Sequence, residues 1–145
     1  MELRPSIDVA SRIHTEIKQL PVEVRLLGNP ALQAIAQEML KESHVRITDQ
    51  GTPVQLLSME EYGTLFFAGF LEDMDLPRGY YLLYSIPEVE LQYFAEHHGI
   101  TWVDEPKSDI RIMLDNIAQE QPQTFFSLLR SAQRLQMILR KEKSN

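Results

Sequence analysis

The spacing of apolar residues along the chain predicts several amphipathic helices. Apolar side chains recur every three or four positions in each of these segments, which gives each helix one hydrophobic face. Ser58 with Glu61 and Ser85 with Glu88 have the spacing of capping boxes, and Ser108 is a third candidate cap. The segment 58–71, which includes Phe70 and Leu71, is apolar enough to predict a mostly buried helix. The predicted helices span residues 6–20, 30–40, 58–71, 85–98 and 108–119, and a last helix begins at Pro122.

Short runs of β-branched, aliphatic and aromatic residues between these helices predict strands. The runs lie at residues 22–27, 44–48, 54–57 and 80–84, each beside turn-forming residues. The turn residues at 49–53 predict that the strand 54–57 returns directly from the strand 44–48.

Alternation of strands and helices indicates an α/β fold with a partly parallel sheet. The last two helices have no strand between them, so we expect them to form an α-helical hairpin. We expect one domain over residues 1–145. It comprises an N-terminal helix and strand (1–29), an α/β core (30–105) and the C-terminal hairpin (106–145).

Charge divides the chain into an acidic body and a basic end. The 145 residues carry a net charge of −7, yet residues 107–145 hold 7 basic and only 4 acidic side chains. Arg130 and Arg134 are four residues apart and therefore share one helix face. Cations near the end of a helix also complement its dipole, so the basic end is explained either by helix stability or by contact with an acidic partner.

The chemistry available to the chain is narrow. It has no cysteine, which excludes disulfides, thiolate nucleophiles and cysteine-held clusters from this chain. The four histidines lack metal-ligand spacing, the six glycines form no phosphate-binding motif, and no serine stands in a nucleophile motif. We therefore expect no metal and no cofactor. With no secretory signal and no membrane-spanning run in the sequence, we expect a cytoplasmic protein.

The second half of the sequence nevertheless resembles a known family. Residues 86–90 (IPEVE), with Tyr93, Ala95 and Gly99, are followed by residues 109–114 (DIRIML) and by residues 122–135 (PQTFFSLLRSAQRL). In order and spacing these pieces resemble the PP-loop ATP pyrophosphatases that thiolate tRNA, the two-thiocytidine and two-thiouridine synthetases. The resemblance implies a partial Rossmann-like fold of the adenine nucleotide alpha hydrolase type, in a truncated relative that keeps the C-terminal half.

Departures from that family concern its catalytic parts. The SGGxDS phosphate loop has no counterpart, and residues 57–59 (LSM) stand where GHN is expected. The resemblance therefore implies a degenerate nucleotide motif at Ser58, Glu60 and Glu61, and the absence of cysteine removes the sulfur chemistry. Whether the chain is an enzyme stays open, with the missing motifs favouring a pseudoenzyme.

The resemblance implies a non-catalytic accessory or regulatory protein. Its expected partners are tRNA, a full-length tRNA-thiolation enzyme, or a second copy in a homodimer. Two alternatives remain: a small nucleotide-binding protein or enzyme that uses Glu60, Glu61 and Asp104, or a globular adaptor without an RNA role. The candidate RNA- or partner-binding residues are Arg111, Arg130, Arg134, Arg140 and Lys141.

Overall fold

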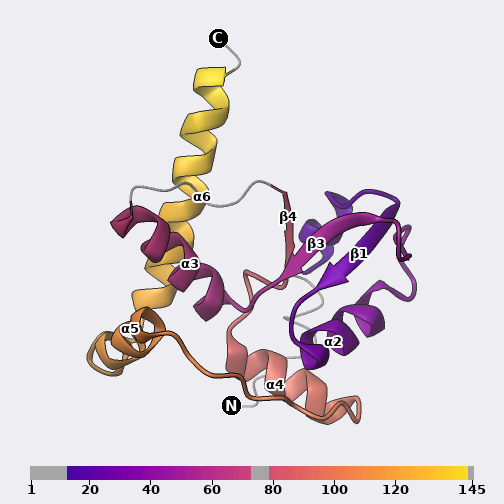
Figure 1. Ribbon diagram of the computed structural model, residues 1–145, viewed down its shortest axis with the longest axis horizontal. Coiled ribbons are helices and arrows are strands. Elements are labelled where there is room, and N and C mark those ends of the chain that lie inside the picture. Colours follow the sequence, from indigo (N-terminus) through magenta and orange to yellow (C-terminus); the bar gives the residue numbers. More distant parts are fainter. Residues whose placement is uncertain (1–12, 73–78, 144–145) are drawn as a thin grey trace. The chain divides into compact units, whose positions relative to one another are not determined.

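The computed structural model describes residues 13–72 and 79–143, which divide into two compact units (Figure 1). Unit 1 contains residues 13–58 and 79–106, and unit 2 contains residues 59–72 and 107–143. The segment 59–72, expected within the α/β core, thus groups with the C-terminal helices.

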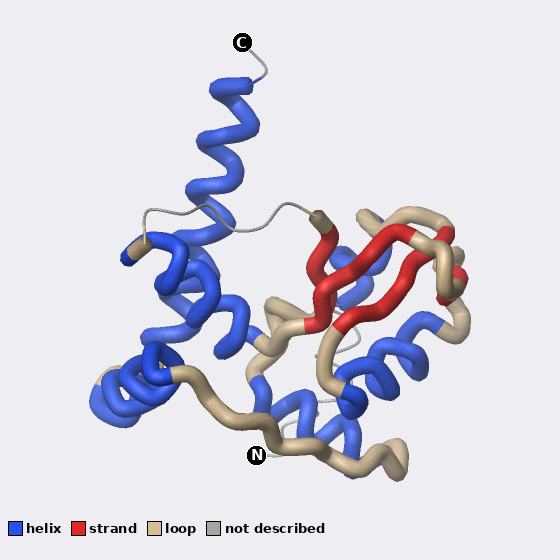
Figure 2. The backbone as a smooth tube through the Cα atoms, in the orientation of Figure 1, coloured by secondary structure: helices blue, strands red, loops and turns tan. Residues whose placement is uncertain are grey.

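Unit 1 is built on a four-stranded parallel sheet, drawn in red in Figure 2. Its strands are β1 (Glu23–Leu27), β2 (Arg46–Ile47), β3 (Thr52–Leu56) and β4 (Tyr80–Leu82), in the order β2-β1-β3-β4. Val24 pairs with Thr52, and Leu56 pairs with Leu82. The expected α/β class is confirmed, and every described strand pair is parallel.

Helices α2 (Pro30–Leu40) and α4 (Glu88–His97) pack against each other beside this sheet (Figure 1). The core of unit 1 consists of fully buried aliphatic side chains from strands and helices, including Val24, Val54, Leu82, Ile35 and Leu91. Residues 13–18 form the described part of the first predicted helix, and residues 6–12 lie outside the described residues. Its apolar stripe is confirmed where it is described, because Ile13 and Ile17 join the same core.

The expected return from 44–48 to 54–57 is wrong. β2 and β3 do not pair with each other but lie on opposite sides of β1. The intervening segment crosses the start of β1, where a Cβ on Gly51 would lie 2.5 Å from the main-chain nitrogen and carbon of Val24. Only glycine permits this approach, and the crossing brings the chain to the other side of β1 in a parallel direction.

The cap predicted at Ser85 is also wrong. The N-cap of α4 is Pro87, and the Ser85 hydroxyl instead donates to the buried Glu16 carboxylate. The other end of α4 is as expected. Gly99 is left-handed with φ +67°, and the amide of Ile100 donates to the carbonyl of Ala95 at 2.8 Å, which completes a Schellman motif.

Unit 2 is a packed group of three helices: α3 (Met59–Leu71), α5 (Asp109–Glu120) and α6 (Thr124–Lys143). The expected helical hairpin is formed by α5 and α6, although α6 begins at Thr124 rather than Pro122. Gly63 of α3 lies close to α6, since a Cβ there would be 3.4 Å from side-chain atoms of Leu128 and Phe125. Figure 1 shows α6 running well beyond the end of α3.

The end of α3 departs from its predicted burial. Phe70 and Leu71 are 74% and 58% exposed, whereas Tyr62 near the start of the helix is buried. Hydropathy alone predicted a mostly buried helix, but its fully buried residues lie in the first part of α3 and the last residues are exposed.

We expect Gly51→Ala to destabilise the fold by about 2 kcal/mol or more, because the added methyl group overlaps the main chain of Val24. Chemical denaturation measures the loss. Gln50→Ala, an exposed change in the same turn, is the matched control and is expected to stay near wild type. Equal stability of the two variants would contradict the crossing.

Candidate functional site

Parallel sheets bind ligands beyond the carboxyl ends of their strands, where successive connections leave in opposite directions. In unit 1 this switch point lies between β1 and β3, because the chain passes from β1 to β2 on one side and then to β3 on the other. The turn from β1 into α2 contains Gly28 and Asn29. Such a turn is where a parallel α/β sheet presents a helix N-terminus to a phosphate.

Side chains in and next to this turn form hydrogen bonds with main-chain groups of the turn and of the helix start. Asn29 Oδ1 accepts from the Ala31 amide at 2.7 Å, and Asn29 Nδ2 donates to the carbonyl of Val103 at 2.8 Å. Gln33 Nε2 donates to the Gly28 carbonyl at 2.8 Å. The oxygen that caps α2 thus belongs to Asn29, in the place where a bound phosphate oxygen would accept the same kind of bond.

The sequence placed a chain break at residues 28–30 and the start of a helix at Pro30, but it did not single out Asn29. An Asn directly before a Pro that opens a helix is a capping pattern, and it could have located the start of α2 as a site. The contact with Val103, 74 residues away, had no sequence pattern.

Ser58, Glu60 and Glu61, the expected degenerate motif, stand where the chain passes from unit 1 to unit 2. Ser58 follows β3, is 2% exposed and is the last residue of this part of unit 1. Glu60 and Glu61 lie in the first turn of α3, in unit 2, where acidic side chains complement the helix dipole. The Glu60 carbonyl accepts a bond from the Thr64 hydroxyl at 2.7 Å.

Arg111 is a structural residue of unit 2 rather than an exposed binding residue. It is only 4% exposed, and its guanidinium pairs with Glu61 through Nη1 and with Asp115 through Nε at 3.0 Å. The guanidinium carbon also lies 5.6 Å from the centre of the Phe125 ring. Because Arg111 links α5 to α3 and α6 in this way, we assign it to the packing of the three helices.

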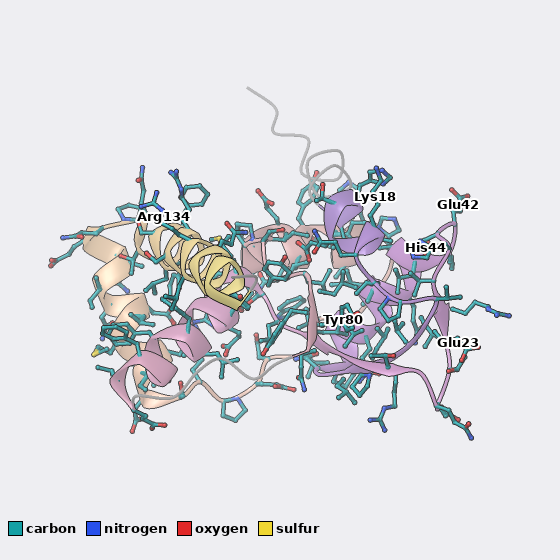
Figure 3. All side chains as sticks on the ribbon, turned by 90° about the horizontal axis from the view of Figure 1, so that it is seen from above. Lys18, Glu23, Glu42, His44, Tyr80 and Arg134 are labelled. Carbon is teal, nitrogen blue, oxygen red and sulfur yellow. The ribbon has the colours of Figure 1, made fainter. Side chains whose placement is uncertain are left out.

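The outward face of α6 carries two of the other candidates, Arg130 and Arg134. Arg130 and Arg134 are exposed and one turn apart, and Figure 3 labels Arg134 on this helix. The Arg130 guanidinium carbon lies 5.8 Å from the ring centre of Phe126, which is 48% exposed. Neither arginine forms an ion pair with a described carboxylate. Arg140 and Lys141 belong to the last turns of the same helix. We call Phe126, Arg130 and Arg134 the α6 stripe.

Metal ligands do not gather in the described parts of either unit. No group of three or more histidine and acidic side chains among residues 13–72 and 79–143 suits a metal ion. His44 and His98 instead bond to main-chain carbonyls of Leu20 and Phe94, at 3.1 and 2.9 Å. Across the same residues, no helix has both the length and the apolar character needed to cross a bilayer.

Glu16 is a buried carboxylate that sequence analysis did not single out. It is 6% exposed, and its Oε1 accepts from the Leu83 amide at 2.8 Å while its Oε2 accepts from the Ser85 hydroxyl. Leu83 has φ +75°, a left-handed conformation that costs about 1–3 kcal/mol in a residue with a side chain. Glu16 thus holds the turn that follows β4 in place.

Burial raises the pKa of Glu16 from 4.5 to about 7, although the bonds from Ser85 and Leu83 act in the opposite direction. The loss of solvation affects the pKa more than the hydrogen bonds do. The folded protein therefore keeps the Glu16 proton over a pH range in which the unfolded chain has released it.

Taken together, the parallel sheet, its switch point and the helical unit define an α/β protein of the Rossmann-like class. Comparison with solved structures finds a similar fold in the U34-tRNA thiolase NcsA from Methanococcus maripaludis, a structure that contains a [4Fe–4S] cluster. The alignment has a TM-score of 0.50 and 12% identity, and covers 90% of this chain and 67% of that one. No family model and no curated protein matches the sequence. The described residues thus have a fold similar to that of the PP-loop thiolases.

The residues of this chain do not fit the cluster of that structure. Protein-bound iron–sulfur clusters are held chiefly by cysteine thiolates, and the chain has no cysteine. No chemical step through such a cluster is therefore assigned to this chain.

We expect the unfolding free energy to decrease as pH rises from about 4.5 to about 7, because the unfolded chain loses the Glu16 proton first. The pKa difference corresponds to about 3 kcal/mol. Glu16→Gln should remove this part of the pH dependence, and Glu96→Gln, an exposed change, should retain it. Denaturant titrations at about pH 5 and about pH 8, which span most of this range, test the difference. If the unfolding free energy of both variants changed equally between the two pH values, the assignment to Glu16 would be wrong.

Proposed function

We propose that the protein is a non-catalytic accessory protein of tRNA thiolation that binds tRNA through the α6 stripe. The main support for this proposal is the pair of exposed arginines, Arg130 and Arg134, beside an exposed aromatic ring on one face of α6. The tRNA substrate named for the structurally similar thiolase supports the choice of nucleic acid.

The chemistry of the stripe suits RNA. Arginine forks bind phosphate oxygens with two parallel hydrogen bonds, and these contacts provide affinity without sequence recognition. An exposed aromatic ring and an adjacent guanidinium offer surfaces on which an unpaired base can stack. Arg140 and Lys141 continue the positive charge along the same helix.

Three observations support a non-catalytic role. Asn29 occupies the capping position at the start of α2, Glu61 pairs with Arg111, and the chain lacks cysteine. In the proposed role, the protein presents or retains tRNA for a complete enzyme. A full-length tRNA-thiolation enzyme is accordingly the proposed protein partner.

We expect Arg130→Glu with Arg134→Glu to weaken tRNA binding at least about tenfold, because two phosphate contacts become repulsive. Fluorescence anisotropy with labelled tRNA measures the affinity over a series of salt concentrations. The wild-type affinity should fall steeply with salt, and the variant should show a shallower slope.

The matched control is Arg25→Glu with Arg46→Glu, which makes the same charge change at two exposed arginines of unit 1. It should affect binding much less than the α6 variant. An equal loss in both variants would mean that only net charge matters, and the assignment to α6 would then be wrong.

We expect MgATP to leave the melting temperature unchanged, because Asn29 and Gln33 already satisfy the turn between β1 and α2. A ligand present at 100 times its dissociation constant would stabilise the fold by about 2.7 kcal/mol, a readily measured shift. Thermal denaturation with and without MgATP tests this, and a magnesium-dependent increase would support the nucleotide-binding alternative instead.

A further inference from the structure

The outward face of α5 combines apolar and acidic side chains. Ile112, Met113 and Ile117 are 48%, 40% and 43% exposed. Asp109 and Glu120 are also exposed and stand at the two ends of the helix. We call these five residues the α5 stripe. The helix contains one basic residue, and because that residue is the buried Arg111, no cation of α5 offsets these acids.

The stability of α5 does not account for Glu120. Asp109 lies in the first turn, where negative charge complements the helix dipole, but Glu120 lies at the opposite end, where negative charge is unfavourable. An acidic side chain beside exposed apolar groups therefore fits a partner that brings both apolar and basic groups.

The α6 stripe of the same chain has this complementary composition. It carries the Phe126 ring and, one and two turns further, Arg130 and Arg134. With a rise of 1.5 Å per residue, Arg130 lies about 6 Å along the helix from Phe126. The centre of the apolar part of the α5 stripe lies about 8 Å from each terminal acid. If the Phe126 ring packs on the centre of this apolar part, Arg130 comes within reach of Asp109 or of Glu120. This holds whether the two helices are parallel or antiparallel.

We propose that two copies of the chain pair through these surfaces, with the α5 stripe of each copy against the α6 stripe of the other. A two-fold axis makes the two contacts equivalent and closes the assembly as a dimer. Pairing of α5 with α5 is disfavoured, because both orientations place acids opposite acids. Pairing of α5 with α6 instead joins opposite charges around apolar contacts.

Dimer formation would control tRNA binding by the α6 stripe, and this part of the inference rests on the proposed function. The arginines that contact tRNA are the ones that contact the second copy. Self-association and tRNA binding are therefore mutually exclusive, and tRNA drives the dimer to monomers by mass action.

The test is a charge exchange followed by sedimentation velocity and by tRNA anisotropy. Four proteins are compared: the wild type, an α5 variant (Asp109→Lys with Glu120→Lys), an α6 variant (Arg130→Glu with Arg134→Glu), and a combined variant with all four changes. A fifth protein, Asp109→Asn with Glu120→Gln, is a milder α5 variant that retains the Ser108 cap and avoids a cation in the first turn. Circular dichroism verifies that each variant is folded.

We expect the wild type to dimerise, and each two-residue variant to dimerise at least about tenfold more weakly. The combined variant should return to within about threefold of the wild type, because the same charges meet in reverse. Added tRNA should convert the wild-type dimer to a monomeric complex. The α5 variant should bind tRNA at least as tightly as the wild type, and the α6 and combined variants should bind it poorly.

A wild type that stays monomeric up to about 100 μM, or a combined variant that fails to recover, would overturn the pairing. A dimer that persists with tRNA bound would overturn the exclusivity. If the charge exchange restores the dimer but no protein binds tRNA, the pairing stands and the proposed function fails. The two failures are thus distinguishable.

Discussion

The contact of Gly51 with the main chain of Val24 determines the arrangement of unit 1. At this point the chain crosses β1, so that β2 and β3 lie on opposite sides of the same strand. A side chain at position 51 would prevent the crossing, because its Cβ would overlap main-chain atoms that have no freedom to move. The order β2-β1-β3-β4 follows, and with it the switch point at the carboxyl ends of β1 and β3.

The turn at that switch point supplies, from its own side chains, the hydrogen bonds that the start of α2 needs. The turn between β1 and α2 keeps a glycine, with φ +142° at Gly28, and a helix that begins directly after it. The Asn29 side chain supplies the oxygen that the helix N-terminus requires and also ties the turn to Val103. When a side chain of the protein already accepts a bond from the amide at a helix N-terminus, an anion binds there less favourably. The anion must first displace that intramolecular hydrogen bond.

The sequence predicts local features well and distant contacts poorly. Helix spacing located α2, α5 and the shared face of Arg130 and Arg134, because each depends on residues three or four positions apart. Arg111 was a binding candidate in the sequence, but it is buried and pairs with Glu61, fifty residues away, a contact that no local pattern predicts. The sheet order was missed for a similar reason, since Gly51 forms a common turn pattern and its contact with Val24 has no local sequence pattern.

The distribution of charge within unit 2 connects folding with recognition. Arg111 is neutralised by Glu61 and Asp115, so its charge stabilises the helices and is hidden from solvent. The charges left at the surface are separated by helix, with acids on α5 and arginines on α6. Two neighbouring helices of opposite charge cannot present both faces to the same polyanion, because the acidic face repels it. We therefore infer that an anionic ligand binds at α6 and that a basic surface binds at α5. A single short connection, residues 121–123, joins the two helices, so whatever binds one of them is held close to the other.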